Sequence, residues 1–300
     1  MSPDQSTFLA EEIIRIKNRE LKLKRWRNLA LGLLLVLLVQ NWKFSGRQDP
    51  MDAAHIAVFN INEVIDQYSD FWNQFGRLDR ENAKAALILM NSPGGTPGDS
   101  ERLYNEIELI RKIMPVTVLV ENQATSGAYL ASLASDRIYA YNSAIVGSIG
   151  IVSTNTVAKV LFEKIGIEQE LFTVGQNKGY PNHYEKTPPH VVNNLQQLMQ
   201  SDQNWFLGLV VKRRNLDKSI LPDIKEAQVY SAIDGLTLGL IDGFSTRHDQ
   251  IEMLRDEVGD LPIKNLEVDE AESFFASLFN PKRAFMALSK MVSYSQLMRY

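Results

Sequence analysis

The sequence has 300 residues, of which 45% are hydrophobic and 23% charged. This composition suits a globular protein with a sizeable core and excludes a mostly disordered chain, a collagen-like repeat and a multi-span membrane protein. Cysteine is absent, which excludes disulfides and a cysteine nucleophile, and the net charge of −4 argues against a general nucleic-acid binder.

The N-terminal part differs from the rest in charge. Residues 1–47 contain nine basic and four acidic side chains and so carry a charge of +5, although the whole chain is negative. An unbroken apolar run at 29–39 lies between Trp26 and Trp42. As a helix, the stretch from one tryptophan to the other is about 25 Å long at ~1.5 Å per residue. That length is within the lower range for a membrane-spanning helix with interfacial tryptophans.

We therefore predict a cytoplasmic basic segment at 1–25, a transmembrane signal anchor at 26–42 and a linker at 43–54. Basic residues that precede a span stay in the cytoplasm. The rest of the chain is thus predicted to lie on the periplasmic or extracytoplasmic side of the inner (cytoplasmic) membrane. A cleaved signal peptide and a soluble buried helix remain alternatives, although QNWKFSGRQ contains no clear small-x-small cleavage site.

Beyond the linker, short apolar runs alternate with helical patterns. This alternation predicts an α/β fold with largely buried strands. The predicted strands are 55–61, 85–90, 116–120, 137–141 and 145–152, and the predicted helices are 100–113 and 188–214, with a small helix–turn unit at 228–243.

The last forty residues have a different pattern. From Leu261 onward, aromatic and aliphatic residues recur at helical spacing, which is typical of a packing or interfacial helix. We predict one domain at 55–260 and a C-terminal amphipathic tail at 261–300.

Ser126 is the candidate nucleophile. It follows the predicted strand 116–120 and begins a run of small residues that reads as the start of a helix. The amide of Gly127 can face a developing oxyanion there, and the Gly/Pro turn NSPGG can supply a second amide because glycine lets the backbone turn inward. Alone, the serine would more often be a helix cap and NSPGG an ordinary tight turn, but the two features lie one strand apart.

Several motifs together resemble the signal peptide peptidase A family of serine proteases. They are LILMNSPGG, ENQATSGAYLASLASDRIYA, AIVGSIGIV and, later, AIDGLTLGLIDGF, and the resemblance covers residues 55–245. It implies a Clp protease/crotonase-like fold with repeated strand-strand-helix units. It also implies a Ser–Lys dyad and no cofactor.

The resemblance assigns roles to individual residues. Ser126 is the expected nucleophile, Lys178 the general base and Ser148 the residue that orients the lysine. Gly95 and Gly127 are the expected oxyanion donors. A lysine base must be deprotonated near neutral pH, which requires burial or a cationic neighbour that lowers its pKa.

The surroundings of the lysine depart from the family pattern. The family usually has Ser-Gly before the lysine and an acid after it, whereas Val174-Gly175 and Lys178-Gly179 stand here. Lys186 is therefore a competing base. No histidine occurs in residues 140–160, where a base of the Clp protease type would be expected.

The expected function is that of a membrane-anchored serine endopeptidase. The resemblance implies that it hydrolyses hydrophobic peptides, such as cleaved signal peptides or membrane protein fragments, and assembles as a homo-oligomeric ring at the membrane. No nucleic-acid partner is expected. Two alternatives remain, a catalytically inactive membrane-associated scaffold and a crotonase-like acyl-CoA enzyme.

Overall fold

The computed structural model describes residues 53–267 and six single positions between 17 and 32. The chain divides into two units, Met1–Ala53 and Ala54–Tyr300. The described positions of the first unit are helical up to Gly32, but most of the predicted anchor at 26–42 lies outside the described residues, as does the tail from residue 268. Among the residues described, no helix is both long and apolar enough to cross a membrane.

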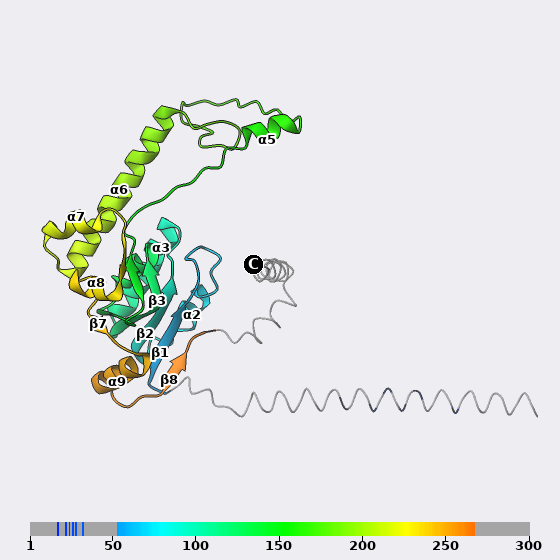
Figure 1. The fold of residues 1–300 in the computed structure, drawn as a ribbon. Helices are drawn as coiled ribbons and strands as arrows, with labels where there is room; N and C mark the ends of the chain where they lie inside the picture. The colour runs from blue at the N-terminus through cyan, green and yellow to red at the C-terminus, as the bar shows by residue number, and fades with distance from the viewer. Residues whose placement is uncertain are drawn as a thin grey trace, which may run out of the picture. The chain divides into compact units, whose positions relative to one another are not determined.

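An eight-stranded sheet forms the centre of the second unit (Figure 1). Its main path runs β6-β5-β3-β2-β1-β8, and β4 pairs with both β3 and β7. All strand pairs are parallel except β5–β6. The strands are β1 His55–Ile61, β2 Ala83–Ser92, β3 Val116–Thr125, β4 Arg137–Ala140, β5 Ile145–Gly147, β6 Val229–Ser231, β7 Gly243–Phe244 and β8 Ile263–Asn265. The predicted α/β class is therefore confirmed, and the sheet is mixed and mainly parallel.

Helices cover both faces of this sheet, as buried parallel strands require. On one face, alternate residues of β1, β2 and β3 pack with α3 (Pro97–Arg111), α4 (Gly127–Ser132) and α6 (Pro189–Arg214). On the other face, Ile251 and Leu254 of α9 (Arg247–Val258) pack on the remaining strand residues. The other helices are short: α2 Trp72–Arg77, α5 Lys159–Lys164, η2 Lys218–Ile220, α7 Leu221–Ile224 and α8 Ala232–Thr237.

Two features of the sheet differ from the sequence prediction. The strand predicted at 145–152 ends at Gly147, because Gly147 and Ser148 both adopt positive φ angles, 98° and 51°, that leave the extended conformation. At the opposite edge, β8 pairs in parallel with β1. The sheet thus takes one strand from the first residues of the segment assigned to the tail.

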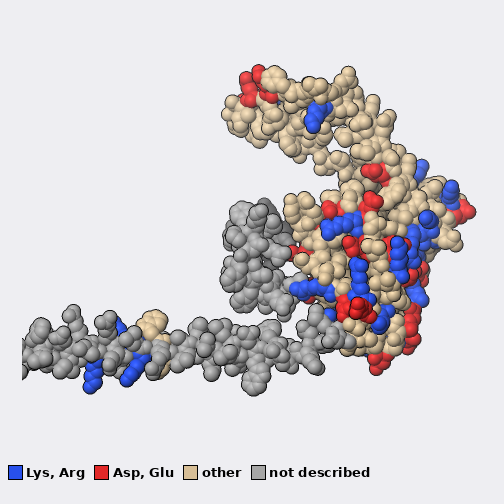
Figure 2. All heavy atoms as spheres, turned by 180° about the vertical axis from the view of Figure 1, so that it is seen from behind, with Lys and Arg blue, Asp and Glu red and all other residues tan. Residues whose placement is uncertain are grey.

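Between β5 and α6 the chain makes a long excursion, residues 151–188, which we call the arm. The arm leaves the sheet, carries the short helix α5 and ends at the start of α6, which leads the chain back to the sheet (Figure 1). Its residues are mostly exposed, including the apolar side chains of Val152, Phe172 and Val174 at 85%, 87% and 97%. On the face seen in Figure 2, most charged side chains gather on the sheet region and few lie on the arm. The arm therefore presents apolar surface that no other described residue covers.

Candidate active site

Ser126 lies where β3 passes into α4, and its backbone is strained. Its φ of 53° and ψ of −124° fall in a region that residues with a side chain rarely adopt. Holding such a conformation costs about 1–3 kcal/mol and is typical of functional sites. Two hydrogen bonds hold it in place: the Ser126 amide donates to the Gly147 carbonyl at 2.8 Å, and the Leu130 amide donates to the Ser126 carbonyl at 3.0 Å.

The predicted Gly/Pro turn packs directly against this serine. A Cβ atom placed on Gly94, whose φ is 97°, would lie 2.9 Å from the Cβ of Ser126 and 2.7 Å from the amide nitrogen of Gly127. A Cβ atom on Gly95 would lie 1.8 Å from the Ile65 carbonyl oxygen. Only glycine fits at either position, so the turn can approach the serine closely.

The two predicted oxyanion donors are neighbours. A Cβ atom placed on Gly127 would lie 3.2 Å from the amide nitrogen of Gly95. Within the described part of the chain, neither of these amides donates a hydrogen bond to a backbone carbonyl, whereas the Thr96 amide beside them donates to Ile65 at 3.0 Å. Two adjacent unpaired amides beside a serine can together stabilise a negative oxygen on a substrate bound to that serine.

Ser148 belongs to the same site. Thr125 pairs with Gly147 across β3 and β5, so Ser126 and Ser148 follow paired residues at the carboxyl ends of neighbouring strands. The Ser148 amide donates to the Gln228 carbonyl at 2.8 Å, and the residue is partly buried. The structure therefore brings together four of the five predicted site residues.

Backbone strain is concentrated at this site. Four non-glycine residues among those described have positive φ angles, and three of them are Ser126, Ser148 and Ala227; the fourth, Asn215, ends α6. The Cβ of Ala227 lies 2.5 Å from where a Cβ on Gly150 would be, just beyond Ser148. Sequence reasoning missed Ala227, because alanine carries no signal for a left-handed conformation.

Within this single chain, Lys178 lies away from Ser126 and Ser148. It is an exposed residue of the arm, and its amide donates to the Gly175 carbonyl at 3.0 Å. No hydrogen bond or ion pair joins it to Ser126 or Ser148 within the described residues. The competing Lys186 is also exposed on the arm. Both assignments of the base stay predictions.

A buried tyrosine holds the helix that follows the nucleophile. The Tyr129 hydroxyl of α4 donates to the Leu240 carbonyl at 2.8 Å. Burial raises the pKa of Tyr129 far above its ordinary value, so the phenol stays neutral. This bond fixes α4 to a distant part of the chain and thereby steadies the turn that carries Ser126.

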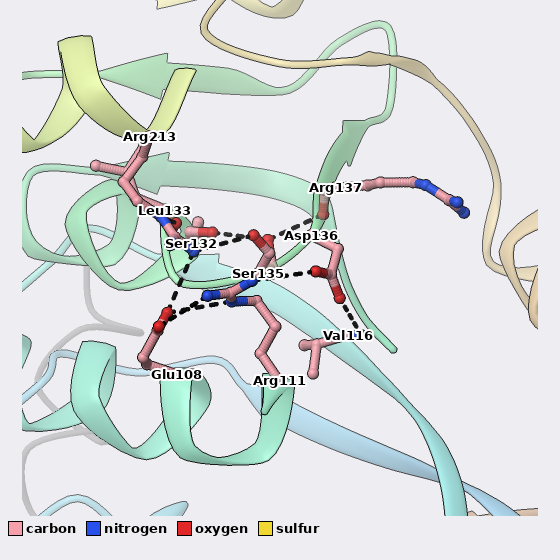
Figure 3. Close-up of polar contacts among 9 residues, drawn as sticks. All are labelled: Glu108, Arg111, Val116, Ser132, Leu133, Ser135, Asp136, Arg137 and Arg213. Atoms are coloured by element: carbon pink, nitrogen blue, oxygen red, sulfur yellow. Dashed lines mark hydrogen bonds and ion pairs between the residues drawn. The ribbon is translucent and has the colours of Figure 1, made fainter. Parts of the chain in front are cut away.

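A second polar cluster lies at the opposite, amino end of β3 (Figure 3). Glu108 binds Arg111 at 2.7 Å and Arg213 at 3.3 Å, and the Val116 amide donates to Asp136 at 2.9 Å. The hydrogen bond from Arg111, followed by the charge of Arg213, lowers the pKa of Glu108. A cavity of about 470 Å³ opens beside the cluster. Because its charged groups bind one another, we interpret this cluster as structural.

A strained serine at a strand-to-helix turn, with two unpaired amides beside it, is the arrangement of a serine hydrolase with an oxyanion hole. The comparison with known families agrees. The model of peptidase family S49 matches residues 108–259, and the chain belongs to this family.

Individual relatives cover most of this chain but only part of their own length. A Brucella melitensis protein named Na(+)/H(+) antiporter NhaA is 30% identical over 76% of this chain and 32% of its own. An Enterococcus faecium protein that bears the name signal peptide peptidase SppA is 27% identical over 63% of this chain and 56% of its own. Protease 4 of Haemophilus influenzae is 28% identical over 71% and 37%.

The first three relatives named are thus matched over about a third to little more than half of their length. Among solved structures, a mutant of the 1510-N membrane-bound stomatin-specific protease in complex with a substrate peptide aligns with a TM-score of 0.47. It is 16% identical over 76% of this chain and 98% of that one.

Proposed function

We propose that the chain is a serine endopeptidase in which Ser126 is the nucleophile. The observation that carries the proposal is the strained Ser126 backbone beside the unpaired amides of Gly95 and Gly127. Such geometry costs stability and is typical of functional sites. Membership of a peptidase family supports the same reaction class.

The proposed reaction forms and then hydrolyses an acyl-enzyme. The Ser126 hydroxyl attacks the peptide carbonyl and gives its proton to the base, and the carbonyl oxygen becomes negative. The amides of Gly95 and Gly127 donate to that oxygen, and the protonated base then supplies a proton to the leaving amine. Water then attacks the acyl-enzyme through the same steps, which releases the carboxylic acid product and frees Ser126.

Lys178 is the proposed base, and Ser148 is proposed to orient it. Because Lys178 is exposed on the arm in this copy, we propose that the pair forms between neighbouring copies in a homo-oligomeric ring. The exposed apolar side chains of the arm support this, since a second copy would remove them from water.

The proposed substrates are hydrophobic peptides such as cleaved signal peptides or membrane protein fragments. The apolar run at 29–39 between two tryptophans supports a single-pass anchor in the inner membrane, with its N-terminus in the cytoplasm. The catalytic domain would then act on the periplasmic or extracytoplasmic side, next to the bilayer that releases such peptides.

The test is hydrolysis of fluorogenic peptides with a large apolar residue before the scissile bond, by the full chain in detergent. We expect Ser126→Ala and Lys178→Ala to lose at least about a thousandfold in kcat while they keep their assembly state. Lys186→Ala is the matched control and should retain activity. If Lys186→Ala is inactive and Lys178→Ala is not, the base is Lys186. If the wild type cuts no peptide in a varied set, the inactive scaffold replaces the proposal.

Mixing the two inactive variants tests the pairing between copies. In rings assembled from equal amounts of Ser126→Ala and Lys178→Ala chains, about a quarter of the interfaces would join an intact serine to an intact lysine. Recovery of a corresponding part of the activity supports pairing between copies. No recovery, despite mixed assembly, would place both residues in one copy.

A further inference from the structure

Ser100 has a buried hydroxyl that no other described group binds. It lies in the first turn of α3 and is 1% exposed, and its Oγ atom has no hydrogen-bond partner among the described residues. An unpaired buried hydroxyl costs stability, because it has lost its bonds to water and gained none. Such a group needs an explanation in terms of what stands next to it.

The neighbour of this hydroxyl is the candidate oxyanion hole. A Cβ atom placed on Gly127 would lie 1.9 Å from the Ser100 Oγ atom and 2.7 Å from its Cβ. The Ser100 side chain therefore occupies the space that a side chain at residue 127 would need. It lies directly against Gly127, whose amide is a proposed oxyanion donor.

The Ser100 hydroxyl does not bond to the backbone carbonyl that its own helix makes available to it. A serine within a helix commonly bonds to the carbonyl four residues earlier, and Ser132 of α4 does so with Ala128 at 2.7 Å. For Ser100 that carbonyl belongs to Thr96, which accepts the Ser100 amide at 3.0 Å but not its hydroxyl. The side chain is turned toward Gly127 instead.

We propose that Ser100 is a positioning residue for the oxyanion hole. Its hydroxyl seats the Gly127 backbone so that the Gly127 amide points to the same place as the Gly95 amide. The oxyanion develops in the transition state and the tetrahedral intermediate and is absent from the bound substrate, so this support acts on kcat rather than on substrate binding. The inference rests on the proposed function, because it requires that these two amides stabilise a reacting oxygen.

The experiment compares Ser100→Ala with Ser132→Ala in the full chain in detergent. Both changes remove one buried serine hydroxyl from a helix, but only Ser132 uses its hydroxyl in a hydrogen bond. We expect Ser100→Ala to lower kcat about tenfold, with KM within about twofold and Tm unchanged or higher. We expect Ser132→Ala to lower Tm by about 2–4 °C and to keep kcat within about twofold.

A second measurement does not depend on turnover of a peptide. A fluorophosphonate probe bonds its phosphorus to the Ser126 oxygen as fluoride leaves and the hydroxyl proton passes to the general base. Its phosphoryl oxygen takes the place of the oxyanion. We expect Ser100→Ala to slow this labelling by about the same factor as kcat. Ser126→Ala is the control that must not be labelled.

Packing of residue 100 against Gly127 has its own test. Gly127→Ala should unfold at a lower temperature than the wild type, and Ser100→Gly in the same chain should restore part of that loss, because it vacates the space. Additive effects on Tm would contradict the contact.

The outcomes separate the two proposals. If the wild type is active and labelled, and Ser100→Ala matches it in kcat and labelling rate, the role of Ser100 is overturned and the proposed function stands. If the wild type neither cuts peptides nor reacts with the probe, the proposed function fails, and the positioning role fails with it.

Discussion

The two ends of strand β3 differ in how their polar groups are used. At the carboxyl end, Ser126 is strained and the amides of Gly95 and Gly127 have no backbone partner among the described residues. At the amino end, Val116, Asp136 and their charged neighbours bind one another (Figure 3). One end therefore keeps donors free at a cost in stability, and the other end supplies stability. Substitutions at the carboxyl end should therefore mainly reduce activity, and substitutions at the amino end should mainly reduce stability.

The largest effect should come from replacing the nucleophile by glycine. Ser126→Gly removes the hydroxyl and should reduce peptide hydrolysis at least about a thousandfold. Glycine also adopts the backbone angles of residue 126 without strain, so the free energy of unfolding should rise by about 1 kcal/mol.

Chemical denaturation and peptide hydrolysis check both parts of this prediction. Ser126→Ala is the control, because it removes the hydroxyl but keeps the strain, so it should lose activity without gaining stability. If Ser126→Gly is no more stable than Ser126→Ala, the backbone at residue 126 is not under strain.

Loss of Arg213, at the amino end, should lower stability and leave activity nearly unchanged. Its guanidinium donates to the Leu133 carbonyl at 2.6 Å and pairs with Glu108, so Arg213→Ala leaves both without this partner. We expect the free energy of unfolding to fall by about 2–3 kcal/mol, while kcat of the folded enzyme stays within about twofold.

Urea unfolding measures the effect of Arg213→Ala. The matched control is Lys225→Ala, which breaks an exposed pair with Glu226 and should cost less than about 0.5 kcal/mol. Equal losses for both variants would mean that the cluster in Figure 3 contributes no more than a surface ion pair.

A smaller effect on stability is expected at Ala227, a strained residue that has no proposed role in the reaction. Ala227→Gly relieves a φ of 55° and should raise the free energy of unfolding by up to about 1 kcal/mol, with activity nearly unchanged. Asn215→Gly at the end of α6 is the control and should change it by only a few tenths, because asparagine tolerates this conformation. A loss of stability in Ala227→Gly would show that the packing of the Ala227 side chain outweighs the strain of its backbone.

The smallest effect should be a difference in acid sensitivity. Arg111, and then Arg213, lower the pKa of Glu108 below its unfolded value. Its ionised form therefore stabilises the fold above the unfolded pKa, and this contribution is lost as pH falls through the lower pKa of the folded state. Acid unfolding followed by circular dichroism should show a shallower loss of stability below pH ~4.5 in Glu108→Gln than in the wild type. Identical slopes would contradict this role for Glu108.

Local patterns predicted much of the fold. The strand at 55–61 is confirmed residue for residue, and the helix predicted at 188–214 begins one residue later. Both are strongly patterned segments, where apolar spacing alone decides the structure. The helix predicted at 100–113 begins earlier, at Pro97, because the Thr96 side chain accepts the Asp99 amide and proline suits the first turn.

Other parts could not be predicted because they depend on distant contacts. Strand β3 continues beyond residue 120 through the polar residues up to Thr125, where it pairs with β5 rather than β4. No local pattern indicates that change of partner. The strain at Ala227 and the unpaired hydroxyl of Ser100 likewise follow from neighbours far away in the chain.

The sequence by itself determined the α/β class, the nucleophile candidate and the glycine positions of the turn, because residue type and spacing carry these features. The tertiary structure alone decided which groups meet. It set Ser148 beside Ser126, placed Ser100 behind Gly127 and left Lys178 on an exposed arm. Distances between segments far apart in the chain follow from how the sheet and helices pack, and no local pattern encodes them.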